Sequence, residues 1–211
     1  GFVTRPPRAR AAPLDVRLIR GLPAVADRPV ALTIGNFDGV HRGHQAMLAR
    51  LIEAADDLGL VPAVLTFDPH PREFFSKEHA PPRLSSLRGK LDVLRTLGVE
   101  RVFVARFGRA FASLDPDRFV EEVLVRRLGA RWVLVGEDFR YGRARAGDLA
   151  LLRRHARTFS VEAMHAVEVH GERASSTLVR EALAAGELER ATKLLGRPYA
   201  IGGHVAHGAK L

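Results

Sequence analysis

Two histidines stand three residues apart, directly after a glycine-rich turn, in the segment GNFDGVHRGH at residues 35–44. This spacing places both imidazoles on the first turn of a helix, where free backbone N–H groups and the helix dipole favour a phosphate group. We therefore predict that His41 and His44 bind a polyphosphate, with Gly43 leaving room for a base or a ribose. A pair of helix-capping histidines is one alternative. A zinc pair is another, although no further ligand stands at the usual zinc spacing.

A second anion-binding cluster is predicted near the end of the chain, in the segment RASSTLVR. Ser176 and Thr177 open a helix, so hydroxyl groups gather with unpaired N–H groups at its positive end. Arg173 lies just before this helix and Arg180 lies one turn into it, and guanidinium groups favour phosphate. The alternative is an ordinary helix cap, for which Ser175 alone would be sufficient.

Two more polar segments each follow a predicted strand. In the first, TFDPHP, Pro69 and Pro71 are expected to stiffen an extended loop and to hold His70 between them. In the second, VGEDFRYG, acidic, aromatic and arginine side chains converge between glycines. A rigid crossover with packed aromatic rings is the alternative for the first segment, and simple surface solvation is the alternative for the arginine-rich second one.

These residues need a scaffold of alternating strands and helices. Short apolar runs predict strands at residues 30–34, 61–67, 101–106, 131–135 and 159–164, with Val16–Ile19 as a candidate edge strand. Helical spacing and caps predict helices at residues 43–58, 86–97, 116–128, 148–157, 175–184 and 187–195. Strands separated by helices indicate an α/β fold with a Rossmann-like, doubly wound and mostly parallel five-stranded sheet. Ligands bind beyond the carboxyl ends of such strands, where the polar segments are expected.

The composition narrows the classes of function. The chain has 211 residues with 33 Lys+Arg against 24 Asp+Glu and no cysteine, which excludes disulfides, thiolate metal sites and a cysteine nucleophile. No apolar run reaches the roughly 18 residues of a membrane span, so we expect a cytoplasmic protein without a membrane partner. The net charge of +9 favours surface solvation and attraction of anionic small molecules over nucleic-acid binding.

Five ordered motifs give the chain a family resemblance: GNFDGVHRGHQ, TFDPHP, FASLDPDRFVEEVL, VGEDFRYG and SSTLVR, followed by LGRPY. Together they resemble the FMN adenylyltransferase domain of bacterial bifunctional riboflavin kinase/FAD synthetases, which belong to the HxGH nucleotidyltransferase superfamily. The resemblance covers about Val30 to Tyr199. It implies an Arg/Pro-rich extension at residues 1–28, the adenylyltransferase domain at residues 29–195, and a junction with the truncated start of a β-barrel riboflavin kinase domain at residues 196–211.

The resemblance also implies a reaction, in which FMN and ATP give FAD and pyrophosphate with Mg²⁺ held by phosphates and water. A riboflavin kinase module is expected in the same full-length chain, so kinase activity should lie outside these 211 residues. The residues implied for catalysis are His41, His44, Arg173, Ser176, Thr177 and Arg180. Those implied for ATP are Gly35, Asn36, Phe37, Asp38, Gly43 and Asp138. Those implied for the flavin are Pro69, His70, Pro71, Phe75, Phe119 and Tyr141.

Two rival functions stay open at this point. One is another adenylyltransferase of the same superfamily that takes a nicotinamide or pantetheine phosphate, against which the aromatic residues and the FDPHP loop argue. The other is a non-catalytic module that binds nucleotides or nucleic acid. Such a module could dispense with the two histidines and the SSTLVR arginine, all of which are present here.

Overall fold

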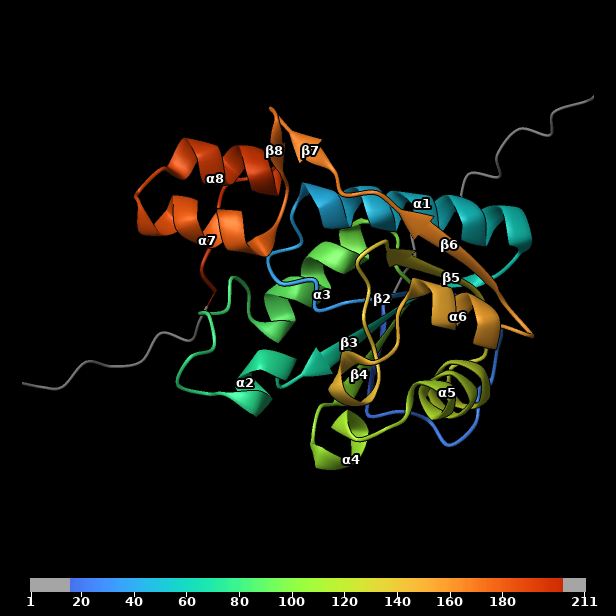
Figure 1. Ribbon diagram of the computed structural model, residues 1–211. Coiled ribbons are helices and arrows are strands. Elements are labelled where there is room, and N and C mark those ends of the chain that lie inside the picture. Colours follow the sequence, from blue (N-terminus) through green and yellow to red (C-terminus); the bar gives the residue numbers. More distant parts are fainter. Residues whose placement is uncertain (1–15, 203–211) are drawn as a thin grey trace, which may run out of the picture.

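The computed structural model describes residues 16–202, which form one sheet covered by helices on both faces (Figure 1). The sheet has six strands in the order β1-β4-β3-β2-β5-β6, and every pairing is parallel. The strands are β1 (Arg17–Arg20), β2 (Val30–Ile34), β3 (Val61–Asp68), β4 (Arg101–Arg106), β5 (Ala130–Gly136) and β6 (Ser160–Met164). The predicted α/β architecture is therefore confirmed.

The candidate edge strand at Val16–Ile19 is confirmed as β1, and because β1 pairs with β4 at the edge, the sheet has six strands where five were predicted. This strand is short and only half-buried, so its sequence lacks the continuous apolar run that marks a central parallel strand. The ion pair between Asp27 and Arg101 also ties the segment before β2 to the start of β4. The domain boundaries drawn at residues 28 and 195 stay predictions.

Successive side chains of the strands point to opposite faces of the sheet and so belong to two separate hydrophobic cores. One core, containing Val30 and Leu32 of β2, packs against η1 (Phe119–Arg127), which continues the short helix α5 (Pro116–Arg118), and against α6 (Leu149–His155). The other core contains Ala31 of β2 and Val64 of β3, and it packs against α1 (Arg42–Leu58) and α3 (Leu87–Thr96). This division into two faces is what a doubly wound sheet requires.

Several short elements differ from the expectations. The segment after β3 was predicted to be an extended loop, but a short helix α2 (Pro71–Phe75) begins there, because proline at the first helical position loses no hydrogen bond. The helix predicted at residues 116–128 starts as α5 and continues as a π-helix, η1. The helix α4 (Arg109–Ala112) and the 3₁₀ turn η2 (Arg143–Arg145) were not predicted.

The C-terminal part of the described chain forms a small unit beside the sheet (Figure 1). It contains the antiparallel hairpin β7 (Glu168–Val169) and β8 (Glu172–Arg173), then α7 (Ser176–Ala184) and α8 (Leu188–Leu195). Most of the barrel start expected within residues 196–211 lies outside the described residues, which end at residue 202. Within residues 16–202, no helix is long and apolar enough to cross a membrane.

Candidate active site

The site lies where the winding of the sheet reverses, at the carboxyl ends of the adjacent strands β2 and β5. In an open α/β sheet this is the position at which loops separate and leave a crevice. The loop after β2 leads into α1, and the loop after β5 carries the VGEDFRYG segment. Two motifs far apart in the sequence therefore border the same crevice.

Two adjoining cavities occupy this crevice, with volumes of about 940 Å³ and 340 Å³. The predicted site residues that line both cavities are Gly35, Phe37, His44, Asp138 and Ser176. Those that line the large cavity alone are Asn36, Asp38, His70, Pro71, Phe75, Phe119, Tyr141, Thr177 and Arg180. Those that line the small cavity alone are His41, Gly43 and Arg173. Pro69 lines neither cavity. All the other predicted site residues therefore lie around the same crevice.

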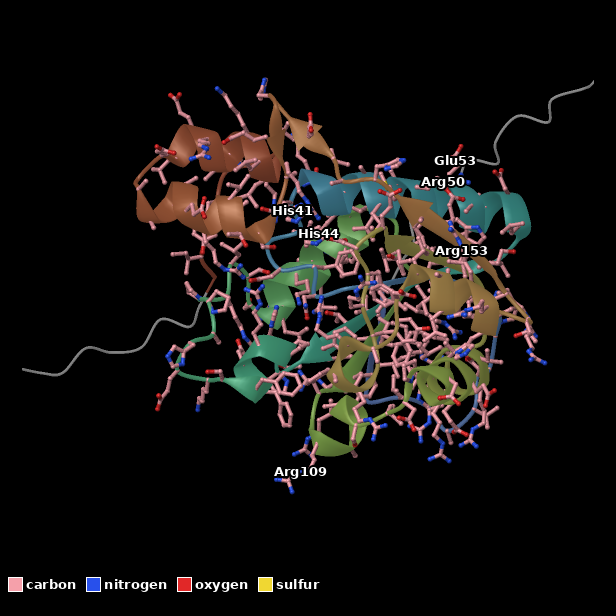
Figure 2. The ribbon with its side chains drawn as sticks, viewed as in Figure 1. His41, His44, Arg50, Glu53, Arg109 and Arg153 are labelled. Carbon is pink, nitrogen blue, oxygen red and sulfur yellow. The ribbon has the colours of Figure 1, made fainter. Side chains whose placement is uncertain are left out.

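The two histidines form a stacked pair at the start of α1, and Figure 2 shows them beside each other there. Their ring centroids are 3.6 Å apart and the planes differ by 20°. His41 is also the cap of α1, because its Nδ1 accepts a hydrogen bond from the backbone N–H of His44 at 3.3 Å. Its Nε2 therefore carries the proton in the neutral form. A Cβ on Gly43 would lie 3.0 Å from the His41 ring, so glycine permits this close approach.

Both imidazoles are neutral near pH 7. Burial lowers the pKa of His41 to about 4, and the positive charge of Arg173 acts in the same direction. Burial also lowers the pKa of His44 well below its usual value, with His41 and Lys90 adding to the shift. A neutral imidazole donates one N–H, so each ring can give a hydrogen bond to a phosphate oxygen without being a cation.

Asp38 is a structural hub in the wall of the large cavity. Its buried carboxylate accepts hydrogen bonds from the backbone N–H groups of Leu84 at 3.0 Å and Ser85 at 3.1 Å. It also forms an ion pair with Arg180, whose Nε donates to the carbonyl oxygen of Pro82 at 2.7 Å. The guanidinium of Arg180 thus lines the cavity with its position fixed by a carboxylate.

The hydroxyl-rich start of α7 joins the loop after β2. Ser175 caps this helix by accepting from the N–H of Leu178, as the ordinary-cap alternative expected. Ser176 is not needed as the cap, and its Oγ donates to the carbonyl oxygen of Asp38 at 2.9 Å. The two predicted anion-binding clusters are therefore in direct contact.

Asp138 and Arg173 are paired at the boundary between the cavities, with their nearest side-chain atoms 2.7 Å apart. The hydrogen bond from Arg173 holds the pKa of Asp138 below its usual value. Both side chains remain largely exposed, so this pair can rearrange when a charged ligand arrives. Within residues 16–202, no group of three or more His, Asp or Glu side chains is placed to hold a metal ion.

Lys90 lines neither cavity but supports the main chain of the site, and the sequence reasoning missed it. It is 8% exposed, and its Nζ donates to the carbonyl oxygen of Asn36 and lies 3.4 Å from Oγ1 of Thr66. Burial lowers its pKa, and the charge of Asp38 opposes this shift. The amine thus fixes the main chain where β2 enters the site. The available signal was a lysine on the apolar stripe of α3, three residues after Leu87.

The large cavity has an aromatic side. Ring contacts run from Phe75 through Phe107 and Phe111 to Phe119 and Tyr141, with centroids 5.3–6.1 Å apart. Phe75 is 70% exposed, whereas Phe119 and Tyr141 are 3% and 5% exposed and belong to the core. Phe107 and Phe111 also line the cavity but were not predicted. The signal that could have identified them is their place in the segment after β4, where Phe107 follows the strand directly and Phe111 lies in α4.

His70 is held as expected, because its Nδ1 accepts from the N–H of Arg72 at 3.0 Å and caps α2. Burial lowers its pKa as well. Tyr141 lies against Gly147, where any Cβ would meet the tyrosine ring at 2.6 Å. Burial raises the pKa of the Tyr141 hydroxyl to about 12. Both side chains therefore present fixed, uncharged surfaces at neutral pH.

The fold and the site define an α/β protein of nucleotidyltransferase-like architecture. A crystal structure described as a macrolide-efflux protein from Streptococcus pneumoniae superposes with a TM-score of 0.75 over 88% of this chain and 63% of that one. The sequences are 24% identical, so this likeness concerns the fold alone.

The model of the FAD synthetase family matches residues 24–178, and the chain belongs to this family. Similar proteins described as bifunctional riboflavin kinase/FMN adenylyltransferases occur in Pseudomonas fluorescens, Haemophilus influenzae and Escherichia coli, with identities of 47%, 45% and 43%. Each match covers 93% of this chain. The chain spans 64–65% of the length of these relatives.

Proposed function

We propose that this chain transfers the adenylyl group of ATP to FMN and releases pyrophosphate, forming FAD. The observation that carries the proposal is the stacked His41–His44 pair, which lines the small cavity and, through His44, also borders the aromatic cavity of about 940 Å³. A cavity of this size suits a planar tricyclic ligand better than a small nicotinamide or an acyclic pantetheine. Membership of the FAD synthetase family supports the same substrate.

The reaction is an in-line displacement at the α-phosphorus of ATP. A phosphate oxygen of FMN forms the new bond to phosphorus, and the bond from phosphorus to the bridging oxygen of the β-phosphate breaks. The protein must align two anions and offset the charge that develops, because no covalent intermediate is needed. On this proposal the N–H groups of His41 and His44 donate to the α- and β-phosphates.

The start of α7 takes the leaving group in this mechanism. Ser176 and Thr177 offer backbone N–H groups, Thr177 also offers its hydroxyl, and Arg173 and Arg180 supply positive charge to the β- and γ-phosphates. Mg²⁺ bound to the triphosphate would offset further negative charge, and Asp138 is the carboxylate that borders both cavities. Gly35 and Gly43 let the nucleoside approach the main chain in the small cavity.

We further propose that the whole protein also phosphorylates riboflavin, through a module outside the present chain. The support is the description of the relatives, of which the chain covers less than two thirds. The cytoplasmic location expected from the sequence stays a prediction.

The direct test is to incubate the purified chain with ATP, Mg²⁺ and FMN and to look for FAD by chromatography. Parallel reactions with nicotinamide mononucleotide and phosphopantetheine identify the substrate class. FAD formation with FMN alone supports the proposal. Turnover of either other phosphate, with no FAD, would assign the chain to a different adenylyltransferase.

A further inference from the structure

The turn η2 carries two arginines with different surroundings. Arg143 forms an ion pair with Asp115 at 2.8 Å and lines neither cavity. Arg145 lines the large cavity and forms no ion pair with any of residues 16–202. Both arginines of this turn are exposed, but one is paired with a carboxylate outside the cavities and the other borders the large cavity without a partner among the described residues.

The backbone of this turn is strained at Arg145 and at the residue before it. Ala144 and Arg145 have φ angles of 53° and 57°, in the left-handed region that residues other than glycine rarely adopt. The base of the loop is closed by reciprocal backbone hydrogen bonds between Tyr141 and Gly147, at 2.9 and 3.1 Å. Strain of this kind persists where the surroundings enforce it, and it concentrates at ligand-binding sites.

The position of Arg145 separates it from the other unpaired cation of the cavity. Arg72 also lines this cavity without an ion pair to the described residues, but it belongs to α2, beside His70. Arg145 lies close enough to Asp138 for its charge to add to the effect of Arg173 on that carboxyl. Asp138 borders both cavities together with His44. Arg145 is thus on the side at which the two substrates must meet.

We infer that Arg145 is a specificity-determining residue that binds the phosphate of the flavin and thereby selects FMN over riboflavin. This inference rests on the proposed function. A guanidinium binds a phosphate dianion through two parallel, charge-assisted hydrogen bonds, and a flavin without phosphate cannot form them. The aromatic side of the cavity contacts the ring of either flavin equally, so it cannot make this distinction.

The test is a fluorescence titration of the purified chain with FMN and, separately, with riboflavin, which requires no turnover. The wild-type chain should bind FMN at least tenfold more tightly than riboflavin. Arg145→Gln should weaken FMN binding by about ten- to a hundredfold, which corresponds to loss of hydrogen bonds to a charged group. Riboflavin binding should stay unchanged, and Arg145→Lys should recover part of the loss.

The matched control is Arg143→Gln, which changes the same residue type in the same turn and should leave both titrations as in the wild type. Unchanged FMN binding in Arg145→Gln would overturn the inference, and so would an equal loss for both flavins or a wild-type chain without preference. The proposed function is judged separately. A chain that binds FMN through Arg145 but forms no FAD with ATP would refute the reaction and keep the inference.

Discussion

At the scale of single residues, the site depends on imidazoles that are kept neutral. His41 uses one ring nitrogen to cap α1, and its other nitrogen carries a proton that it can donate. The capping and phosphate-binding interpretations of the sequence are therefore compatible, since they use different atoms of one ring. The same pair should determine both the rate of the reaction and the response of stability to pH.

We predict that His44→Ala lowers turnover by about a hundredfold or more, because removing one donor to a developing charge costs about 2–4 kcal/mol. The fold should remain intact, since His44 stands at the edge of a loop and a helix. Steady-state kinetics measures the first effect and thermal unfolding measures the second. His170→Asn, at an exposed hairpin position with a φ of 51° that asparagine tolerates, is the control. Full turnover in His44→Ala would refute the phosphate role.

Stability should fall as the pH falls from about 6.5 to about 4. His41 has a pKa of about 4 in the folded chain, so in this window only the unfolded state takes up its proton. The free energy of unfolding then decreases by at most about 1.4 kcal/mol per pH unit for this group. His41→Asn retains a capping oxygen but has no titration, so urea unfolding should show a shallower pH slope. An unchanged slope would show that His41 titrates alike in both states.

At the scale of elements, the aromatic side of the large cavity divides into rings of the core and rings of the surface. Phe119 begins the π-helix η1 and is packed between Phe111 and Tyr141, whereas Phe75 ends α2 and is mostly exposed. A flavin-binding role is predicted for both residues, but it can be tested by substitution without loss of folding only at the exposed Phe75. The burial of Phe119 confounds any loss of binding with loss of folding.

Phe75→Ala should raise the KM for FMN and leave the KM for ATP and the unfolding midpoint unchanged, because its ring is exposed beside the cavity. Phe119→Ala should lower the free energy of unfolding by about 3–5 kcal/mol, the usual cost of removing a buried phenylalanine. Denaturation curves and kinetics of the two variants give this comparison. A destabilised Phe75→Ala variant would contradict the division.

At the scale of the whole molecule, Asp38 joins three segments that are distant in the sequence. Its carboxylate holds the loop before α3 through Leu84 and Ser85, and it holds α7 through Arg180. Its own carbonyl receives the hydroxyl of Ser176. The family resemblance implied that Asp38 binds ATP, which stays a prediction; the structure shows that its carboxylate fixes segments that surround the large cavity.

We expect Asp38→Asn to lower the free energy of unfolding by about 3–5 kcal/mol, because it leaves the mostly buried Arg180 without its counter-charge. Chemical denaturation measures this loss. Asp92→Asn, the same change on the exposed side of α3, should cost less than about 0.5 kcal/mol. Equal stability of the two variants would remove Asp38 from its role as a hub.

Local patterns were sufficient for the elements with strong signals and for the two phosphate-binding clusters, whereas the family resemblance supplied the predicted flavin residues. Central strands such as β2 and β5 are continuous apolar runs, and the first turns of α1 and α7 carry their own caps. Because the strands are parallel, the polar segments after them had to meet at one edge of the sheet. The sequence therefore predicted the fold class and the crevice, and all the predicted site residues except Pro69 line the two cavities.

Tertiary structure decided which of those residues are buried, paired or exposed. Three contacts join segments that are at least 54 residues apart in the sequence: the pairing of β1 with β4, the hydrogen bond from Lys90 to Asn36, and the ion pair of Asp38 with Arg180. The burial of Lys90 also depends on which face of its helix is covered. The strained turn that presents Arg145 is likewise enforced by its neighbours, not by its own sequence. Spacing along a chain reports local geometry, whereas burial and charge pairing depend on what other segments bring to the same place.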